Sequence, residues 1–532
     1  MKLFFLMSLY EIRQKSFLLV LLIFLVSSNA YPQIPSKQID KLVENAMEKF
    51  TVAGVAIAVV KDGKVIHKRG YGVRSIKSKQ RVNERTQFAI ASNSKAFTTA
   101  ALAILVDEGK LSWNDKVVDY IPEFKMYDDY VTQNFNIKDL LTHRSGLGLG
   151  AGDLMIFPSG SDFTLKDVLS SFQYFEPQSA FRTKYDYDNL LYLVSGDIIA
   201  RITGKTWEDF VKTRIFDPLK MKNTYGSLAE MKDKRNLAFP HSTERGSIKM
   251  IEGNIEMARI NGAAGGIYSS VEDLSLWMLA HLNKGKYGSD LDEELFSEAN
   301  QREMWKIQTV MNANRSPRYN SHFKGYGLGW HLTDINGKMK VSHGGVLPGM
   351  LSSTTMIPDI NLGVVILTNT QEGGSYLHRA VTNSIVDSYL KLDDYGWTDT
   401  LYVALNKWLN KGESVSAEVW ETVKSANSDH INISDYIGVY EDNWFGKVEI
   451  FMKSNQLWIK SHRSPILNGP MSYYKANAFA IKWEYQAMNA DAFAIFTLDE
   501  EGKAQSIKMK GISPNIDFSF DFQDLNLQRI KD

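Results

Sequence analysis

Apolar residues recur at helical spacing in two segments near the start of the chain. Residues 36–50 include the apolar residues Ile39, Leu42, Val43, Ala46 and Phe50. They share one face at a period of 3.6 residues, which predicts an amphipathic helix. The second segment follows Ser92, is apolar on nearly every turn and stops at Gly109, where a left-handed helix cap is favoured. The pattern predicts a buried helix that begins just after Ser92.

Strand patterns occur on both sides of that buried helix. Val55–Val60 and Val65–Tyr71 are separated by an Asp-Gly turn, which predicts a hairpin. Two more strands are predicted at Ser352–Ile357 and Leu362–Leu367, followed by a helix from about Ser375 to Leu392. The first part of the chain is therefore predicted to contain both helices and antiparallel strands.

The pattern changes near the C-terminus. From Tyr436 to Leu527, short alternating apolar and polar runs are separated by turn residues, which predicts an antiparallel β unit. The segment before it is polar and helix-prone. We therefore divide the chain into a main domain (31–395), a helical connector (396–430) and a C-terminal β domain (431–532).

Residues 1–30 have the pattern of a secretory signal peptide. Lys2, Arg13 and Lys15 precede the apolar run Phe17–Val26, and small residues around Ala30 suit cleavage. The run is too short to span a bilayer, so no stable membrane span is expected after cleavage. An uncleaved anchor is the alternative. We expect a periplasmic or secreted protein.

Composition narrows the function classes. The 532 residues are 44% hydrophobic and 12% aromatic, as in a folded protein of two globular units. Lys+Arg and Asp+Glu both total 61, so no net field would attract nucleic acid. There is no cysteine, which excludes disulfides, thiolate metal sites and cysteine nucleophiles. Without His-x-x-x-His spacing, we expect no metal and no cofactor.

Candidate chemistry begins with Ser92 and Lys95. Three residues apart at a helix start, they project to the same side, where the amine and the helix dipole favour an alkoxide. The alternative is an ordinary helix-capping serine. The same spacing recurs at Ser321/Lys324, Ser388/Lys391 and Ser472/Lys475. Only Ser92 stands between a strand and a long apolar helix.

Two further motifs follow in order: Tyr187-Asp-Asn189 and His343-Gly344-Gly345. With Ser92-x-x-Lys95, Leu141–Leu147 and Ala264–Ser269, they make the chain resemble class C β-lactamases and penicillin-binding-protein-like serine hydrolases. This family includes D-aminopeptidases, DD-carboxypeptidases and esterases, and the resemblance covers about Ile39 to Ser388. A glycine-rich loop, 146–152, lacks the strand that a phosphate site requires.

The resemblance implies a fold and an architecture. The main domain is expected to have the α/β (α+β) transpeptidase fold, an antiparallel sheet flanked by helices with a helical subdomain. The β domain resembles the lipocalin-like barrels appended to some of these peptidases. Because the motifs all precede it, we assign the β domain no chemistry and expect it to fold separately.

The resemblance also implies roles. Ser92 would be the acylated nucleophile, Lys95 its proton partner, and Tyr187 the general base and acid. Asn189 would bind the substrate amide, and His343 stands where many relatives have lysine. Tyr187 is expected to ionise well below its free pKa of about 10, because it would lie near two cations. Tyr187 as a packed aromatic and His343 as a loop histidine remain the alternatives.

Substrate would lie along the third motif. Gly344 and Gly345 would let it approach the strand edge, and the N–H groups of Ser92 and Val346 would form the oxyanion hole. We therefore expect a secreted serine hydrolase acting on D-amino-acid peptides or esters. A true β-lactamase and a non-catalytic binder of cell-wall peptides are the alternatives. The expected partner is a small-molecule or short-peptide substrate, with the oligomeric state open.

Overall fold

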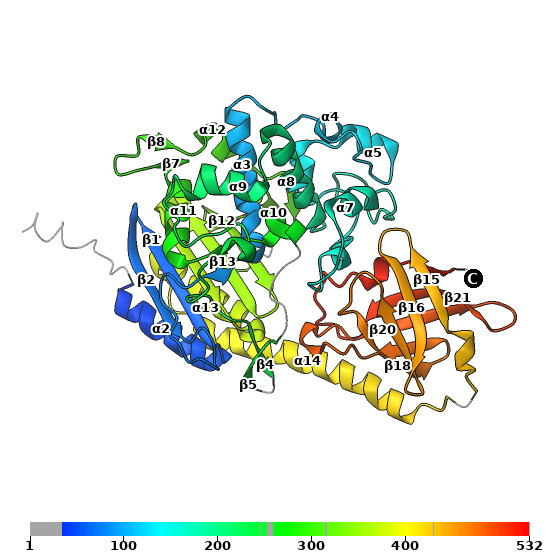
Figure 1. Ribbon diagram of the computed structural model, residues 1–532. Helices are drawn as coiled ribbons and strands as arrows, with labels where there is room; N and C mark the ends of the chain where they lie inside the picture. Colours follow the sequence, from blue (N-terminus) through cyan, green and yellow to red (C-terminus); the bar gives the residue numbers. More distant parts are fainter. Residues whose placement is uncertain (1–33, 245, 253–258, 314–315, 429, 531–532) are drawn as a thin grey trace, which may run out of the picture.

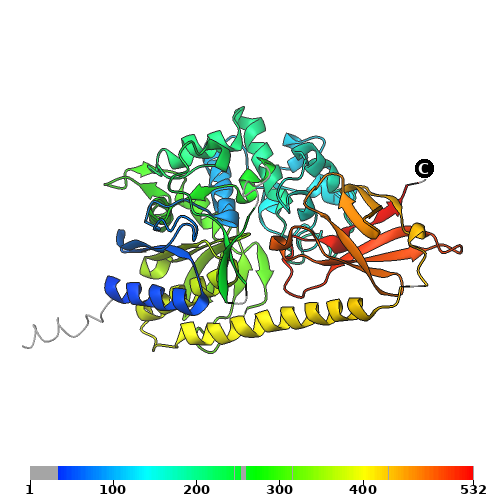
Figure 2. The same cartoon turned by 60° about the horizontal axis from the view of Figure 1, so that its bottom comes forward.

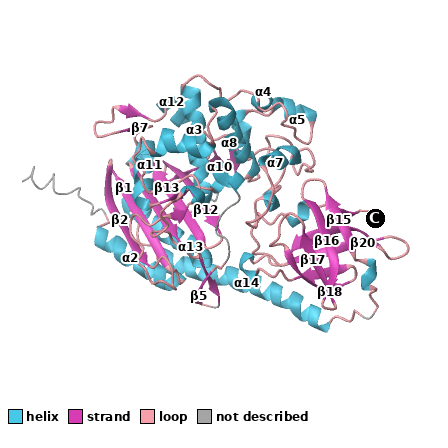
Figure 3. Cartoon of the chain, in the orientation of Figure 1, coloured by secondary structure: helices cyan, strands magenta, loops and turns pink. Residues whose placement is uncertain are grey.

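The computed structural model describes residues 34–244, 246–252, 259–313, 316–428 and 430–530. The predicted signal peptide lies outside this part of the chain. Of the helices within it, none is both long and apolar enough to cross a membrane. Figure 1 shows a mixed α/β unit beside a barrel, and Figure 3 shows that the barrel consists almost entirely of strands and loops.

The main unit is built on an eight-stranded antiparallel sheet. In spatial order its strands are β2 (Lys64–Gly72), β1 (Gly54–Lys61), β14 (Leu362–Thr368), β13 (Met350–Ile357), β12 (Lys338–Leu347), β11 (His331–Ile335), β10 (Lys324–Tyr326) and β9 (Thr309–Met311). The hairpin predicted from residues 55–71 is β1 and β2. Strands β13 and β14 confirm the second predicted pair.

Helices cover both faces of this sheet, as strand β1 shows. Its alternate side chains pack into two separate cores: Val55, Ile57 and Val59 into one, and the two alanines and Val60 into the other. Successive side chains of a strand point to opposite faces, so a strand that is apolar at every position is buried on both. Helices α2 and α13 cover the first face, and α11 covers the second.

The helices of the main unit match the predictions where the apolar spacing was longest. They are α2 (Ser36–Phe50), α3 (Ser94–Asp107), α4 (Val117–Tyr120), α5 (Asp129–Asn134), α6 (Ile137–Leu141), α7 (Leu165–Ser171), α8 (Leu190–Thr203), α9 (Trp207–Val211), α10 (Gly262–Gly265), α11 (Val271–Leu282), α12 (Glu298–Met304) and α13 (Gln371–Tyr389). The helix expected from about Ser375 begins four residues earlier. Helices α4 to α9 form the helical subdomain (Figure 1).

The C-terminal unit is a closed barrel of eight antiparallel strands. They are β15 (Gly438–Asp442), β16 (Gly446–Lys453), β17 (Gln456–Ser461), β18 (Asn468–Lys475), β19 (Ala478–Ile481), β20 (Ala492–Leu498), β21 (Ala504–Gly511) and β22 (Leu527–Arg529). Pairing of Tyr440 with Arg529 closes the circle. The structure confirms the predicted fold class, with a helix-flanked sheet and a lipocalin-like barrel.

One long helix, α14 (Trp397–Ser425), joins the two units (Figure 2). The barrel also packs directly on the helical subdomain. The Arg463 guanidinium binds Asp162 (2.7 Å) and Asp167 (2.9 Å) and lies 4.0 Å from the centre of the Phe163 ring. One of the apolar clusters is continuous across both units: it includes one face of the sheet, the helical subdomain and most of the barrel interior. The barrel therefore packs on the main unit through both ion pairs and apolar contacts, and its separate folding stays a prediction.

We predict that Arg463→Ala lowers the free energy of unfolding by about 1–2 kcal/mol, because it breaks half-buried charged hydrogen bonds. Urea unfolding of the full chain is the measurement. The control is Lys424→Ala on α14, which removes an exposed pair with Glu421 and should change stability by less than about 0.5 kcal/mol. Equal stability of the two variants would contradict an interface held by Arg463.

Candidate active site

Ser92 lies at the middle of a short turn, η1 (Ala91–Asn93), that leads into helix α3. The turn is fastened to strand β13. Asn93 Nδ2 donates to Ser352 Oγ (2.7 Å), and Ser352 Oγ donates to the Ile90 carbonyl (2.5 Å). Ser92 stays partly exposed while the residues on either side are buried. A rigid turn thus presents one hydroxyl to solvent.

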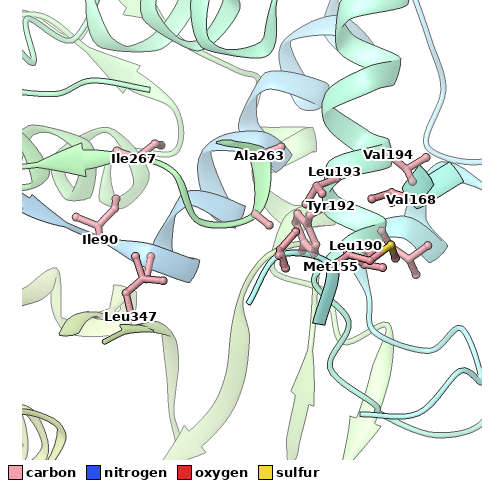
Figure 4. Packing of buried hydrophobic residues seen from close by; sticks show 14 of the residues in the cluster. Ile90, Met155, Val168, Leu190, Tyr192, Leu193, Val194, Ala263, Ile267 and Leu347 are labelled. Carbon is pink, nitrogen blue, oxygen red and sulfur yellow. The ribbon is translucent and has the colours of Figure 1, made fainter. Parts of the chain in front are cut away.

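Apolar side chains pack around this turn. Figure 4 shows Ile90 and Leu347 on one side of the start of α3, and Met155, Leu190 and Tyr192 on the other. The packing explains why the segment after Ser92 is apolar on nearly every turn. It also excludes water from the base of the site, which strengthens the electrostatic interactions there.

Lys95 is completely buried beneath Ser92. Its Nζ lies 3.1 Å from Ser92 Oγ, 2.7 Å from Asn189 Oδ1 and 3.0 Å from the Ala264 carbonyl oxygen. The Tyr187 ring is also close, with its centre 4.8 Å from Nζ. The amine therefore has three hydrogen-bond partners, and one of them is the candidate nucleophile.

Burial lowers the pKa of Lys95 to about 7, although the carboxyls of Asp153 and Asp188 act in the opposite direction. A buried ammonium loses its hydration, so the neutral amine is favoured. Near neutral pH a large fraction of Lys95 is unprotonated and can accept the proton of the Ser92 hydroxyl. The amine is then a base of matched strength for activating a serine.

Tyr187 lies in the loop before α8, and its side chain interacts with Ser92. Its pKa is raised well above 10, chiefly by burial, and the interaction with Ser92 only partly offsets this. The expectation of an easily ionised Tyr187 is therefore wrong. The two expected cations are not both present, because burial also lowers the pKa of His343 well below 6.5. Tyr187 is a neutral hydroxyl next to the nucleophile.

Asn189 connects Lys95 to a carboxyl group. Its Oδ1 accepts from Lys95, and its Nδ2 donates to Asp153 Oδ2 (2.7 Å). The side chain is buried. Asn189 thus holds the amine in place, and its contact with a substrate amide stays a prediction.

His343 is buried, and both ring nitrogens have partners. Nδ1 donates to the Gly344 carbonyl (2.6 Å), so Nε2 accepts from the Tyr326 hydroxyl (2.9 Å). The ring is neutral at neutral pH. These contacts fit the alternative of a satisfied histidine, and a catalytic role for His343 stays a prediction.

Among the described residues, one edge of strand β12 is unpaired where the strand runs past Ser92. Its pairing with β11 ends at Ser342, and residues His343–Leu347 pair only with β13 in the part of the chain that the structure describes. Because backbone groups of an antiparallel strand alternate between its two sides, every second N–H here faces the open side. Val346 is 48% exposed, and a side chain at Gly345 would meet the Ile90 carbonyl at 2.2 Å. The open edge suits an extended substrate, with the oxyanion role of Val346 still a prediction.

Sequence reasoning missed three residues at the site. Asp153 follows the glycine-rich loop 146–152, which aims it at Asn189. Phe518 and Asp521 come from the barrel: the Phe518 ring lies 5.7 Å from that of Tyr187, and Asp521 binds the backbone beside Asp153. The β domain, to which we assigned no chemistry, therefore contacts the site. No motif signalled this, because the contact joins distant parts of the chain.

Comparison with family profiles gives two matches. The profile described as Beta-lactamase matches residues 39–384, more than half of the chain. A second profile, described as a domain of unknown function (DUF3471), matches residues 423–529, which contain the barrel. The first match confirms the predicted family.

Curated relatives are distant. The chain is 26% identical over 402 residues to a protein of Aspergillus campestris named unguisins hydrolase ungD', covering 73% of this chain and 70% of that one. It is 29% identical over 335 residues to protein flp of Staphylococcus aureus strain MW2. That match covers 63% of each chain, so it spans less than two thirds of flp.

Solved structures show the same fold. The octameric penicillin-binding protein homologue of Pyrococcus abyssi matches 92% of this chain and 99% of its own, at 19% identity and a TM-score of 0.56. A penicillin-binding protein of Bacillus halodurans matches 64% of this chain and 98% of its own, at 22% identity and a TM-score of 0.53. The first match extends across both units.

We predict that reaction of the protein with a serine-directed acylating probe accelerates as pH rises through about 7, where Lys95 loses its proton. Protonated Lys95 cannot accept the Ser92 proton, so the rate falls on the acid side. Rates from about pH 5 to about pH 9 give the profile. The fall in rate at low pH is the acid limb of this profile. Lys95→Met keeps the volume of the side chain but not the amine, so it should react slowly and show no acid limb. The same limb in the variant would contradict the role of Lys95.

Proposed function

Since the chain belongs to the Beta-lactamase family, we propose that it is a serine hydrolase that forms an acyl-enzyme on Ser92. The observation that carries the proposal is the contact between Lys95 Nζ and Ser92 Oγ, with Asn189 holding the amine. A buried amine of lowered pKa next to a partly exposed hydroxyl is an activated nucleophile.

Acylation follows from this geometry. The Ser92 Oγ attacks the carbonyl carbon of the substrate while its proton passes to Lys95 Nζ, which becomes an ammonium. The tetrahedral intermediate collapses, the bond to the leaving amine or alcohol breaks, and the leaving group takes a proton. Tyr187 is neutral and interacts with Ser92, which supports Tyr187 as the donor of this proton. Lys95 then returns a proton to Tyr187. Water then hydrolyses the ester and restores Ser92.

We infer that the substrate is a short peptide containing a D-amino acid, or an ester. The open edge of β12 supports an extended ligand that pairs with backbone groups. His343, neutral and satisfied, provides no cation for the carboxylate of a β-lactam, where many relatives have lysine. A relative named as a hydrolase of unguisins agrees with hydrolytic activity. The N-terminal segment supports a periplasmic or secreted location.

A substrate panel tests this proposal. D-aminoacyl amides, short-chain nitrophenyl esters and nitrocefin are offered to the purified protein, with Ser92→Ala as the control. We expect turnover of an amide or ester that is lost in the variant. Nitrocefin hydrolysis at a kcat/KM of about 10⁴ M⁻¹s⁻¹ or more, with the other substrates untouched, would instead identify a β-lactamase. Stoichiometric binding without turnover of any substrate would favour a non-catalytic binding protein.

A further inference from the structure

The loop between β21 and β22 carries a carboxyl group out of the barrel and into the main unit. Asp521 has no exposed surface. Its Oδ2 accepts a hydrogen bond from the Gly152 N–H and its Oδ1 from the Leu154 N–H, both at 2.8 Å. Two bonds to alternate backbone amides fix the orientation of the residue between them, which is Asp153.

Asp153 is the first member of a chain of direct hydrogen bonds that ends at the nucleophile. Its Oδ2 accepts from Asn189 Nδ2, Asn189 Oδ1 accepts from Lys95, and Lys95 contacts Ser92 Oγ. Every side chain between the barrel and Ser92 in this chain is buried. A shift of the 152–154 backbone would therefore move the amide that holds the Lys95 amine.

The same loop makes a second contact with the site. The Phe518 ring packs edge-on against the ring of Tyr187. It also covers Gly150, whose φ of +75° and lack of a side chain are both needed, because a Cβ there would lie 2.8 Å from the Phe518 carbonyl oxygen. The barrel loop and the glycine-rich loop are thus shaped to fit each other beside the nucleophile.

We propose that Asp521 is a positioning residue for the reaction at Ser92, so that docking of the barrel completes the active site. The proposal rests on the serine-hydrolase function proposed above. Asp521 holds Asp153 against Asn189, and Asn189 holds Lys95 on Ser92. Full activity at Ser92 would therefore require the docked barrel.

Charge couples the same groups. Asp521 faces the carboxyls of Asp153 and Asp524, and each buried carboxyl makes ionisation of its neighbour harder. Asp153 in turn faces Asp188 and Lys95. Around Lys95 the remaining titratable groups are Tyr187, Tyr192, His143 and His343. The ionisation of Lys95 therefore depends on how Asp153 and its neighbours are placed around the amine.

Asp521→Asn in the full chain tests the proposal. An asparagine can accept only one of the two N–H groups, so the clamp on Asp153 loosens. We measure the second-order rate of Ser92 acylation by a fluorophosphonate across pH, together with thermal melting. We expect a loss of about 10²-fold, the scale of a misplaced catalytic group, and a displaced acid limb of the pH profile, because Asp153 and Asn189 are then placed differently around Lys95.

The matched control is Asp517→Asn in the same loop. Asp517 is exposed, and its Oδ1 accepts from the Ser519 N–H, which an asparagine oxygen also does. This variant should keep the wild-type rate and pH profile. Adding Asp521→Asn to Asp153→Asn should cost little more than Asp153→Asn alone, because Asp521 acts through Asp153.

Wild-type rate and pH profile in Asp521→Asn, an equal loss in Asp517→Asn, or fully multiplicative losses in the double variant would overturn the proposal. If Asp521→Asn does not fold, Asp521→Glu keeps a carboxyl group but displaces it from the two N–H groups. It should slow acylation, and a wild-type rate would again overturn the proposal. A wild-type protein that takes no adduct would count against the serine-hydrolase function itself, whereas a reactive wild type matched by Asp521→Asn counts against this inference alone.

Discussion

The amine of Lys95 has no exposed surface, so every hydrogen bond that water would provide must come from the protein. Ser92, Asn189 and the Ala264 carbonyl supply those partners from three different elements. Meeting this requirement brings the serine turn, the start of α8 and the α10 turn to one point. The same burial that demands these partners brings the pKa of the amine close to neutral. Structure and reactivity at the site thus share one cause.

The arrangement also explains why the barrel touches the site. Asn189 can hold Lys95 only if its own amide is oriented, and Asp153 orients it. Asp153 stands at the end of a glycine-rich loop, and Asp521 fixes the backbone on both sides of it. Each residue in this series is thus oriented by the next one, which lies farther from Ser92. The last layer lies on another folded unit, which packs on the first through Arg463 and the shared apolar cluster.

Much of this site could be predicted from local pattern. The helix after Ser92 was predictable because its apolar spacing and Gly109 are signals carried within a few residues. The family was predictable because Ser92, Tyr187 and His343 each stand in a short motif. The contact of Asp521 with residues 152–154 was not, since it depends on how two units dock. The pKa of Tyr187 was predicted in the wrong direction, because burial depends on tertiary packing and outweighs nearby charge.

The central claim is that Ser92 is the nucleophile and Lys95 its base. The most direct test is intact-mass spectrometry with peptide mapping after treatment with a fluorophosphonate at neutral pH. We predict a single adduct, located on Ser92 and absent from Ser92→Ala, although Ser321, Ser388 and Ser472 also precede a lysine by three residues. An adduct that persists in Ser92→Ala, or one mapped to another serine, would contradict the account.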